Sequence, residues 1–319
     1  MSITNFQKEK LLKQILLARE FEERLGKLFA ENLLAGWVHL CKGHETMGAA
    51  LSLYMRSDDY LVPYHRSRSS MLAKGLDPKL LFAEIMGKKT GCCSGIGGEA
   101  HIMDVDSRIY GTGGIIGSGI PISVGIAYAS KLSNNDSVVI SGFGEGGSNR
   151  GAFHEALNMA ATWNLGIVFI CENNQYAEFS PQEIQMKIEN VADRAYGYGI
   201  PGEIVDGYDP VACAEVVGKA IERARNNGGP TLIEVKTYRL HGHYEGDPME
   251  YRTKDEYQQW AQRDPVITFR EELCRANVVT EENLQSFEKE MNRMLDEAVD
   301  FALNSPYPDE NDARRFVYA

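Results

Sequence analysis

A glycine-rich turn leading into a helix contains the residues of this chain best suited to binding a charged ligand. The segment from Ser141 to Tyr176 reads SGFGEGGSNRGAFHEALNMAATWNLGIVFICENNQY. The pattern predicts that a strand ends near Ser141, that glycines turn the chain tightly from Gly142 to Gly147, and that a helix then begins. Backbone N–H groups at a helix start favour an anion, and glycines let a phosphate approach the backbone closely. The turn is therefore predicted to bind a phosphate group.

Oxygen ligands for a metal ion accompany this turn. Glu145 lies within it, and the pair Asn173 and Asn174 follows the next predicted strand. The carboxyl ends of neighbouring parallel strands open on the same edge of a sheet, so Glu145 and Asn174 are expected to converge. Carboxylate, amide and backbone carbonyl oxygens suit an Mg²⁺ ion that bridges a diphosphate. The alternative is that Glu145 only stabilises the start of the following helix through the helix dipole.

Alternating strands and helices must position these groups. The predicted strands are Ser137–Ser141, Gly166–Cys171 and Thr231–Lys236, and helices at Arg150–Trp163 and Asp209–Asn226 lie between them. This order implies parallel strands joined by right-handed crossovers. The expected fold class is α/β, with a parallel central sheet flanked by helices. Further helices are predicted at Gln7–Leu34, Gly43–Met55, Pro78–Met86 and over most of the tail from Asp255 onward.

Two other segments stand out by composition. Residues 61–70, LVPYHRSRSS, are unusually basic for this chain and are predicted to be extended. The glycine-rich stretch Thr90–Gly119 shows no clear periodicity. A connection of roughly thirty residues without secondary structure is uncommon in a compact domain unless it has a function. We therefore expect this stretch to have a function.

The overall composition limits the partners and the location. The 319 residues carry a formal net charge of −12, which argues against nucleic acid or an anionic membrane as a partner but allows a local basic pocket. The six cysteines lack the paired spacing of a zinc site and are interpreted as reduced thiols. No apolar signal core opens the chain, and no run of about eighteen apolar residues could span a membrane. A cytoplasmic protein is expected.

The turn and the asparagine pair resemble a known motif. Enzymes that bind thiamine diphosphate carry a G-D-G turn followed some thirty residues later by N-N. More widely, the chain is similar to the alpha subunits of the first components of 2-oxoacid dehydrogenases, namely the pyruvate, branched-chain and acetoin enzymes. The similarity runs from the N-terminal helix to about Val266. Within it, the sequence of residues 237–256, TYRLHGHYEGDPMEYRTKDE, is most similar to that of the acetoin enzymes. It implies one thiamine-diphosphate-binding domain over residues 1–319, with helical N- and C-terminal extensions.

The resemblance also implies roles for individual residues. The metal ligands would be Glu145, Asn174 and the backbone carbonyl of Tyr176. His243 matches a histidine near the diphosphate and the reaction centre, so it is a candidate catalytic residue. The implied contacts to the cofactor's diphosphate and aminopyrimidine ring are His65, Arg66, Gly114, Ile116, Gly146, Gly147 and His243.

Two positions depart from the family's pattern. The acid in the turn is usually Asp, whereas here it is Glu145. Its longer arm must fold back or the metal must shift, because Mg²⁺ demands short bonds and near-octahedral geometry. Arg68 stands where these dehydrogenases usually carry a histidine. An arginine cannot shuttle protons near neutral pH, but it can grip a phosphate or carboxylate of a substrate, so Arg68 is a second candidate catalytic residue.

The resemblance implies an enzyme that works only with a partner. The leading hypothesis is the alpha subunit of a thiamine-diphosphate- and Mg²⁺-dependent enzyme that cleaves acetoin or a 2-oxoacid such as pyruvate. The fragment would pass to a lipoyl carrier, and a beta subunit in an α2β2 assembly would supply the glutamate that activates the cofactor. One alternative, favoured by Arg68, is a split transketolase-like carboligase that moves a two-carbon unit to an aldehyde, sugar or carrier protein. Another, motivated by Glu145, is a non-catalytic regulatory subunit.

Overall fold

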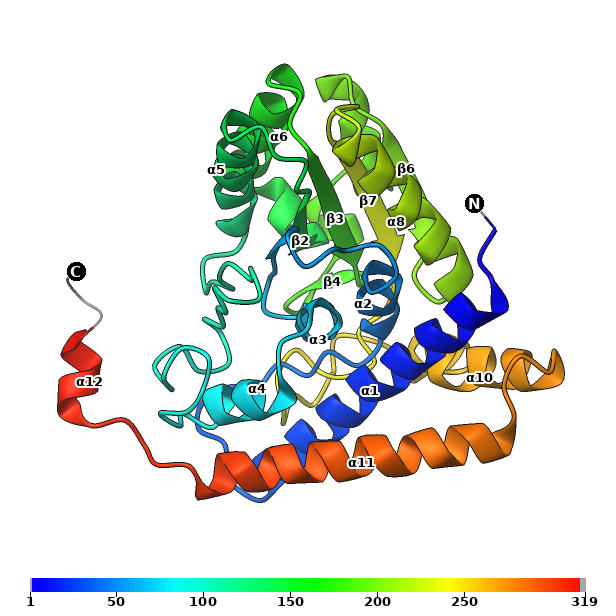
Figure 1. The fold of residues 1–319 in the computed structure, drawn as a ribbon. Coiled ribbons are helices and arrows are strands. Elements are labelled where there is room, and N and C mark those ends of the chain that lie inside the picture. Colours follow the sequence, from blue (N-terminus) through cyan, green and yellow to red (C-terminus); the bar gives the residue numbers. More distant parts are fainter. Residues whose placement is uncertain (1, 316–319) are drawn as a thin grey trace.

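A five-stranded parallel sheet forms the centre of the protein (Figure 1). The computed structural model describes residues 2–315. The order of the strands across the sheet is β1, β2, β3, β7, β6. Every neighbouring pair is parallel, so the predicted α/β class with a parallel central sheet is confirmed. The strand bounds are Tyr60–Val62 (β1), Val139–Gly144 (β2), Ile167–Asn173 (β3), Thr231–Lys236 (β7) and Gly202–Asp206 (β6).

The side chains of β3 show why the sheet lies between two helical layers. Every residue of this strand is buried. Ile167 and Phe169 join one hydrophobic core, whereas Val168 and Ile170 join the other. Alternate side chains of a strand point to opposite faces, so a continuous apolar run indicates a sheet that is covered on both sides. The run GIVFIC is therefore a central strand.

Two groups of helices cover the two faces (Figure 1). On one face, α5 (Gly119–Leu132), α6 (Gly151–Thr162) and the 3₁₀ helix η2 (Val191–Tyr198) pack against the sheet. On the other face, α2 (Glu45–Leu51) and α8 (Pro210–Arg225) contribute to the larger core. Among residues 2–315, no helix is long and apolar enough to cross a membrane.

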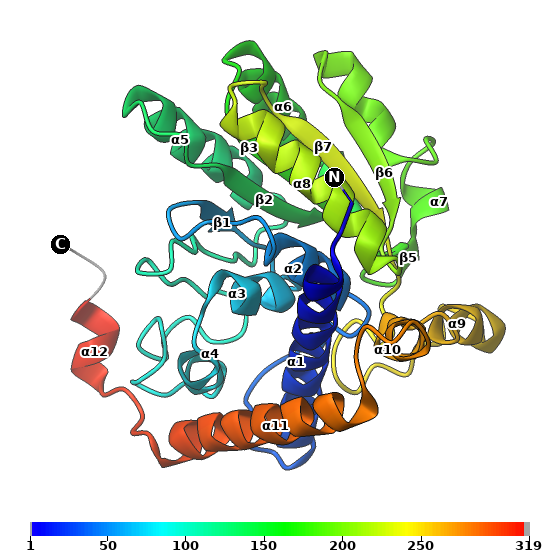
Figure 2. The ribbon, with the colours of Figure 1, turned by 45° about the vertical axis from the view of Figure 1, so that its right-hand side comes forward.

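A further helical layer lies beyond α2. The N-terminal helix α1 (Asn5–Ala30) packs against α2 and crosses the long helix α11 (Glu281–Asn304), as Figure 2 shows. In turn, α11 packs along α4 (Pro78–Ile85). The remaining elements are α3 (Arg68–Lys74), η1 (Glu145–Asn149), β4 (Tyr176–Ala177), β5 (Ser180–Pro181), α7 (Gln182–Gln185), α9 (Lys254–Ala261), α10 (Pro265–Arg275) and α12 (Glu310–Arg315).

Most predicted elements are present, with one error and several omissions, among them the short elements β4, β5, α7 and η2. Strand Thr231–Lys236 has the predicted bounds, and the other predicted strands and helices overlap their observed counterparts. The prediction that residues 61–70 are extended is wrong for its last part, because Arg68 begins α3. Its serines and arginines are compatible with a helix once the segment is buried against α2. Helix α5 and strand β6 were not predicted.

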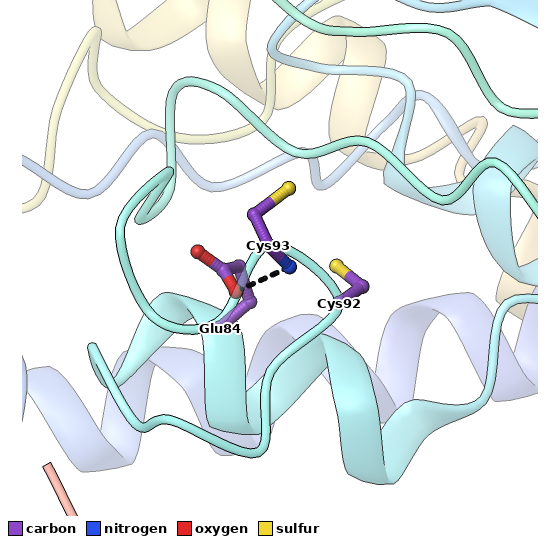
Figure 3. A group of neighbouring side chains, drawn as sticks. All are labelled: Glu84, Cys92 and Cys93. Atoms are coloured by element: carbon purple, nitrogen blue, oxygen red, sulfur yellow. Dashed lines mark hydrogen bonds between the residues drawn. The ribbon is translucent and has the colours of Figure 1, made fainter. Parts of the chain in front are cut away.

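The glycine-rich stretch between α4 and α5 is irregular, as predicted, and a buried glutamate fixes its shape. Glu84, at the end of α4, is fully buried. Its Oε2 accepts the N–H groups of Cys93 and Gly95, and its Oε1 accepts those of Gly97 and Gly98, at 2.7–3.0 Å. Figure 3 shows the backbone nitrogen of Cys93, not its sulfur, directed at the carboxylate. One carboxylate therefore replaces regular secondary structure as the organiser of this stretch.

Candidate functional site

A cavity of about 290 Å³ opens at the carboxyl ends of β2 and β3. The turn after β2, the segment before α5 and the segment after β7 all contribute walls to it. Parallel strands bind ligands at this edge because their following loops converge there. Of the residues predicted from the sequence, those that line the cavity are His65, Arg66, Ile116, Glu145, Gly146, Gly147, Asn174, Tyr176 and His243.

Glu145 presents a buried carboxylate oxygen that lacks a partner. It opens η1 directly after β2 and is 1% exposed. Its Oε2 accepts the N–H of Asn174 at 3.3 Å, whereas its Oε1 has no hydrogen-bond partner among residues 2–315. Burial raises the pKa of Glu145, and the Asn174 N–H offsets only part of this effect. Since buried polar atoms are normally satisfied, this oxygen is suited to a cation that enters the cavity.

Asn174 brings an amide oxygen to the same place. The two residues follow neighbouring parallel strands, so the predicted convergence of Glu145 and Asn174 is present. The Oδ1 of Asn174 accepts the N–H of Tyr176 at 3.1 Å, which leaves one of its two lone pairs free. Gln175, between them, has a φ of +74°, and this turn returns the chain along the cavity wall. The donor set of carboxylate, amide and carbonyl oxygens fits Mg²⁺.

Gly146 leaves room where a side chain would close the turn. A Cβ atom at this position would lie 2.7 Å from the Cβ of Ala177, in the first strand after Asn174. Gly146 and Gly147 both line the cavity. The turn after β2 and the chain beyond β3 can therefore approach each other only because Gly146 lacks a side chain, and this approach shapes the predicted phosphate-binding wall.

Two buried arginines supply positive charge to the cavity. Arg66 donates to the carbonyls of Leu40 and His243 at 2.7 and 2.6 Å. Arg239 donates to the Glu178 carbonyl and the Tyr251 hydroxyl. Neither guanidinium forms an ion pair with a carboxylate in the described part of the chain. Burial, followed by the nearby charge of Arg66, lowers the pKa of Arg239 to about 10. These charges are suited to binding a diphosphate. Arg239 was not predicted from the sequence, and only its place in the segment that contains the motif HGH could have suggested it.

The histidines beside these arginines are uncharged near neutral pH. Burial, and next the charge of Arg66, lowers the pKa of His243 to about 3 and holds the pKa of His65 well below its usual range. The ring of His39 packs edge-on against both, with centroids 5.4 Å from His65 and 5.0 Å from His243. His39 was missed in the sequence because it stands alone in GWVHLC. The cavity therefore combines fixed positive charge with neutral imidazoles.

The remaining predicted residues lie in less direct positions. Ile116 lines the cavity and is 48% exposed, so it also reaches the protein surface. Gly114 does not line the cavity, and its N–H faces the Nε2 of His101 at 3.3 Å. The structure thus brings one of the two predicted ring contacts to the cavity wall and leaves the other beside it.

Arg68 is not brought into the cavity. It is fully buried, and its Nε and Nη2 donate to Glu22 at 2.7 and 2.9 Å. Its Nη1 donates to Glu99 at 2.8 Å, and backbone carbonyls of His39 and His65 take its remaining N–H groups. The predicted grip on a substrate anion requires free donors, and Arg68 has none. Its charge is neutralised within the protein instead.

A cluster of sulfur and oxygen atoms elsewhere does not form a second site. The thiols of Cys92 and Cys93 and the Glu84 carboxylate lie within 4.8 Å of one another. However, both Glu84 oxygens already accept two N–H groups each. All six cysteines are free thiols. The carboxylate therefore serves the loop, and no metal role is assigned to this group.

Comparisons with known proteins agree with this geometry. The sequence model of the family described as "Dehydrogenase E1 component" matches residues 13–311. The chain is 39% identical over its whole length to the alpha subunit of acetoin:2,6-dichlorophenolindophenol oxidoreductase from Bacillus subtilis (strain 168), of which the match covers 95%. It is 40% identical to the corresponding subunit from Cupriavidus necator, over 94% of this chain and 90% of that protein.

Pyruvate dehydrogenases are similar as well. The alpha subunit of the pyruvate dehydrogenase E1 component from Rickettsia bellii is 35% identical, over 97% of this chain and 95% of the relative. The family match and these identities extend over nearly the whole sequence, so the predicted resemblance to alpha subunits of dehydrogenase E1 components is confirmed. The chain belongs to the dehydrogenase E1 component family.

Proposed function

We propose that this chain is the alpha subunit of a thiamine-diphosphate- and Mg²⁺-dependent enzyme that cleaves acetoin or a 2-oxoacid such as pyruvate. The released two-carbon or acyl unit would pass to an acceptor such as a lipoyl carrier. The observation that carries the proposal is the unsatisfied Oε1 of Glu145, which lies in a cavity that also contains two arginines without carboxylate partners. The names of the relatives, acetoin oxidoreductase and pyruvate dehydrogenase alpha subunits, support the choice of reaction.

The chain's own residues would hold the cofactor at its charged end. Glu145, Asn174 and the Tyr176 carbonyl would bind Mg²⁺, while Arg66 and Arg239 neutralise the diphosphate. Thiamine diphosphate supplies a nucleophilic carbon and an electron sink. His65 and His243 are neutral, so they can exchange hydrogen bonds with a substrate oxygen without adding charge. Residues 1–319 would act as one cofactor-binding domain.

A second subunit is part of the proposal. Helices α5 and α6 lie side by side, and both expose large apolar side chains. This face, which we call the α5–α6 face, consists of Ile122, Tyr128, Leu132, Met159 and Trp163. Ile115 and Ile116, which precede α5 in the chain, are also exposed and line the cavity. Clustered apolar side chains of this kind indicate an interface, and the relatives are named as alpha subunits. We place the beta subunit here, in an α2β2 assembly.

The two alternative functions lose the observations that motivated them. The carboligase hypothesis depended on Arg68 gripping a substrate anion, and its donors are all engaged by the protein. The regulatory hypothesis depended on a disabled metal site. Glu145 nevertheless reaches Asn174, and its free oxygen is available for a metal.

Calorimetric titration of thiamine diphosphate and Mg²⁺ into the chain co-purified with its beta subunit tests the proposal. We expect metal-dependent binding that Asn174→Ala weakens by about 100-fold or more, because a ligand is lost rather than only reoriented. Asn304→Ala, at an exposed position at the end of α11, is the matched control. An intact complex that binds no cofactor would disprove the cofactor role. Turnover by the isolated chain would disprove the need for a beta subunit.

A further inference from the structure

One imidazole packs against the two histidines that line the cavity without lining it itself, and it differs from both. His65 and His243 have no carboxylate partner among the described residues, and their pKa values are lowered. His39, packed against both rings, directs its Nδ1 to the Oε2 of Glu99 at 3.2 Å. Its side chain is 19% exposed, and its Nε2 forms no hydrogen bond within residues 2–315. His39 is therefore the imidazole of this group that has an anion on one nitrogen and a free second nitrogen.

Glu99 is held firmly from its other side. Its Oε1 accepts the Arg68 Nη1–H at 2.8 Å and the His39 backbone N–H at 3.3 Å. Burial would raise the pKa of Glu99, but the His39 and Arg68 contacts outweigh it and lower that pKa, so the group is ionised at neutral pH. Because Glu22 binds the far edge of Arg68, the chain of contacts from Glu22 to His39 is continuous.

The backbone around Glu99 is fixed as well. The two residues just before it, Gly97 and Gly98, donate their N–H groups to the Glu84 carboxylate. The main chain at Glu99 is therefore fixed, and its carboxylate has Arg68 as its ion partner and the His39 imidazole as its hydrogen-bond partner. Such an arrangement sets which ring nitrogen carries the proton, since an ionised carboxylate accepts only from an N–H.

We propose that Glu99 is a positioning residue that keeps the proton of His39 on Nδ1, so that Nε2 accepts the hydroxyl proton of an α-hydroxy ketone substrate. This inference rests on the proposed function and narrows its substrate class. When such a ketone is cleaved, the carbinol carbon becomes a carbonyl. The O–H bond breaks, its proton moves to Nε2, and the oxygen's electron pair forms the new C=O bond.

The need for a proton acceptor in this step distinguishes the two candidate substrate classes, α-hydroxy ketones and 2-oxoacids. Thiamine diphosphate, the electron sink of the proposed function, would take up the electron pair of the broken carbon–carbon bond. A 2-oxoacid has no hydroxyl proton to lose when it is decarboxylated, so it needs no such base. A carboxylate–imidazole pair at this site therefore favours an α-hydroxy ketone. The charged and titratable groups around His39 are Cys41, His65, Arg66, Arg68, Glu99 and His243.

The variant Glu99→Gln tests the inference in the complex with the beta subunit. The amide can still accept from Arg68, but its NH₂ group facing His39 favours the opposite tautomer. We expect kcat for acetoin to fall about 10- to 100-fold, KM to change by less than about threefold, and cofactor binding to be retained. Glu203→Gln, an exposed position on β6, is the control.

A readout without turnover separates positioning from a merely structural role. Carbethoxylation of His39 by diethyl pyrocarbonate, followed by peptide mass spectrometry in the cofactor-free complex, reports the nucleophilicity of Nε2. We expect Glu99→Gln to slow it several-fold and Glu99→Asp to restore part of the rate. If Glu99→Gln does not assemble, His39→Gln should show the same loss of kcat with unchanged cofactor binding.

The outcomes distinguish this inference from the proposed function. A wild-type complex that binds no cofactor defeats the proposed function, and this inference with it. A complex that binds cofactor and turns over pyruvate but not acetoin overturns only the inference. The same conclusion follows if Glu99→Gln keeps the wild-type kcat and the wild-type rate of carbethoxylation.

Discussion

Two glycine-rich segments of this protein each surround a buried glutamate, yet they serve opposite purposes. In the stretch between α4 and α5, both oxygens of Glu84 accept two backbone N–H groups each. In the turn after β2, Glu145 accepts one N–H on Oε2 and none on Oε1. Both side chains are almost inaccessible to solvent. Only the number of satisfied oxygens separates a structural carboxylate from a ligand-binding one.

This difference has an energetic meaning. A buried carboxylate with complete hydrogen bonding contributes to stability, whereas a buried oxygen without a partner reduces it. The stretch around Glu84 is therefore complete without a ligand. The turn around Glu145 gains stability when a cation supplies the missing interaction. Substitutions at the two glutamates should consequently shift stability in opposite directions.

The largest effect is expected from Glu84→Gln. The amide nitrogen would face backbone N–H groups that now donate to a carboxylate oxygen, so at least two hydrogen bonds are lost and two buried donors remain unsatisfied. We expect the free energy of unfolding to fall by roughly 3–5 kcal/mol. Urea denaturation of the cofactor-free chain measures it, with the exposed Glu203→Gln as control. Limited proteolysis should show new cleavage within residues 90–118. A loss below about 1 kcal/mol would contradict the structural role of Glu84.

The part of the site at the carboxyl ends of the strands could be predicted from the sequence, because it depends on the order of strands and turns along the chain. Strand Thr231–Lys236 is a short apolar run, and its observed bounds match. Glu145 and Asn174 converge because each follows a parallel strand, which is a property of topology and not of distant contacts. The convergence of the glycine turn and the asparagine pair could therefore be predicted from the order of the strands, whereas the identity of the cofactor came from the family resemblance.

Other features depend on partners far along the chain. Arg68 contacts Glu22 and Glu99, which are separated from it by 46 and 31 residues. No local pattern shows that such a charge is already neutralised, so the sequence suggested a free arginine. Helix α5 was missed because it begins inside a glycine-rich stretch, at Gly119, where turn residues outweigh the apolar periodicity that follows. Tertiary packing alone brings Arg239 to the cavity wall and His39 against the rings of His65 and His243.

Glu145→Gln should have the opposite sign from Glu84→Gln. Glu145→Gln removes the buried negative charge and its desolvation cost, so we expect the cofactor-free chain to become more stable by roughly 1–3 kcal/mol. The amide loses the charge that a divalent cation requires, and cofactor affinity in the complex should fall about 100-fold. Urea denaturation and calorimetric titration measure the two effects. Lower stability together with unchanged cofactor binding would mean that Glu145, like Glu84, is structural.

The pH dependence of this stabilisation follows from the raised pKa of Glu145. A carboxyl group whose pKa is higher in the folded state is most compatible with folding while protonated. Its favourable contribution is present below its unfolded pKa and is lost as the pH rises through its folded pKa. The stability gain of Glu145→Gln should therefore be small at pH 4 and reach its maximum above the folded pKa. A gain that is constant from pH 4 to pH 8 would show that the charge is not its cause.

The smallest effects are expected from replacing a glycine by alanine in each of the two segments. These substitutions compare the segment around Glu145 with the segment around Glu84 through the backbone conformation. In Gly146→Ala, the new Cβ would lie 2.7 Å from the Cβ of Ala177, so the turn must move away from the chain that follows Asn174. In Gly98→Ala, nothing lies within 4 Å, but the backbone has a φ of +59°, which strains an L-residue. Each substitution should reduce the free energy of unfolding by about 1 kcal/mol. Only Gly146→Ala should also weaken cofactor binding directly, by about tenfold, because it changes the spacing between the two strand ends that carry the proposed metal ligands Glu145 and Asn174. Equal losses of affinity in both variants would show that the two segments are coupled, and that the stretch anchored by Glu84 is part of the binding site rather than its support.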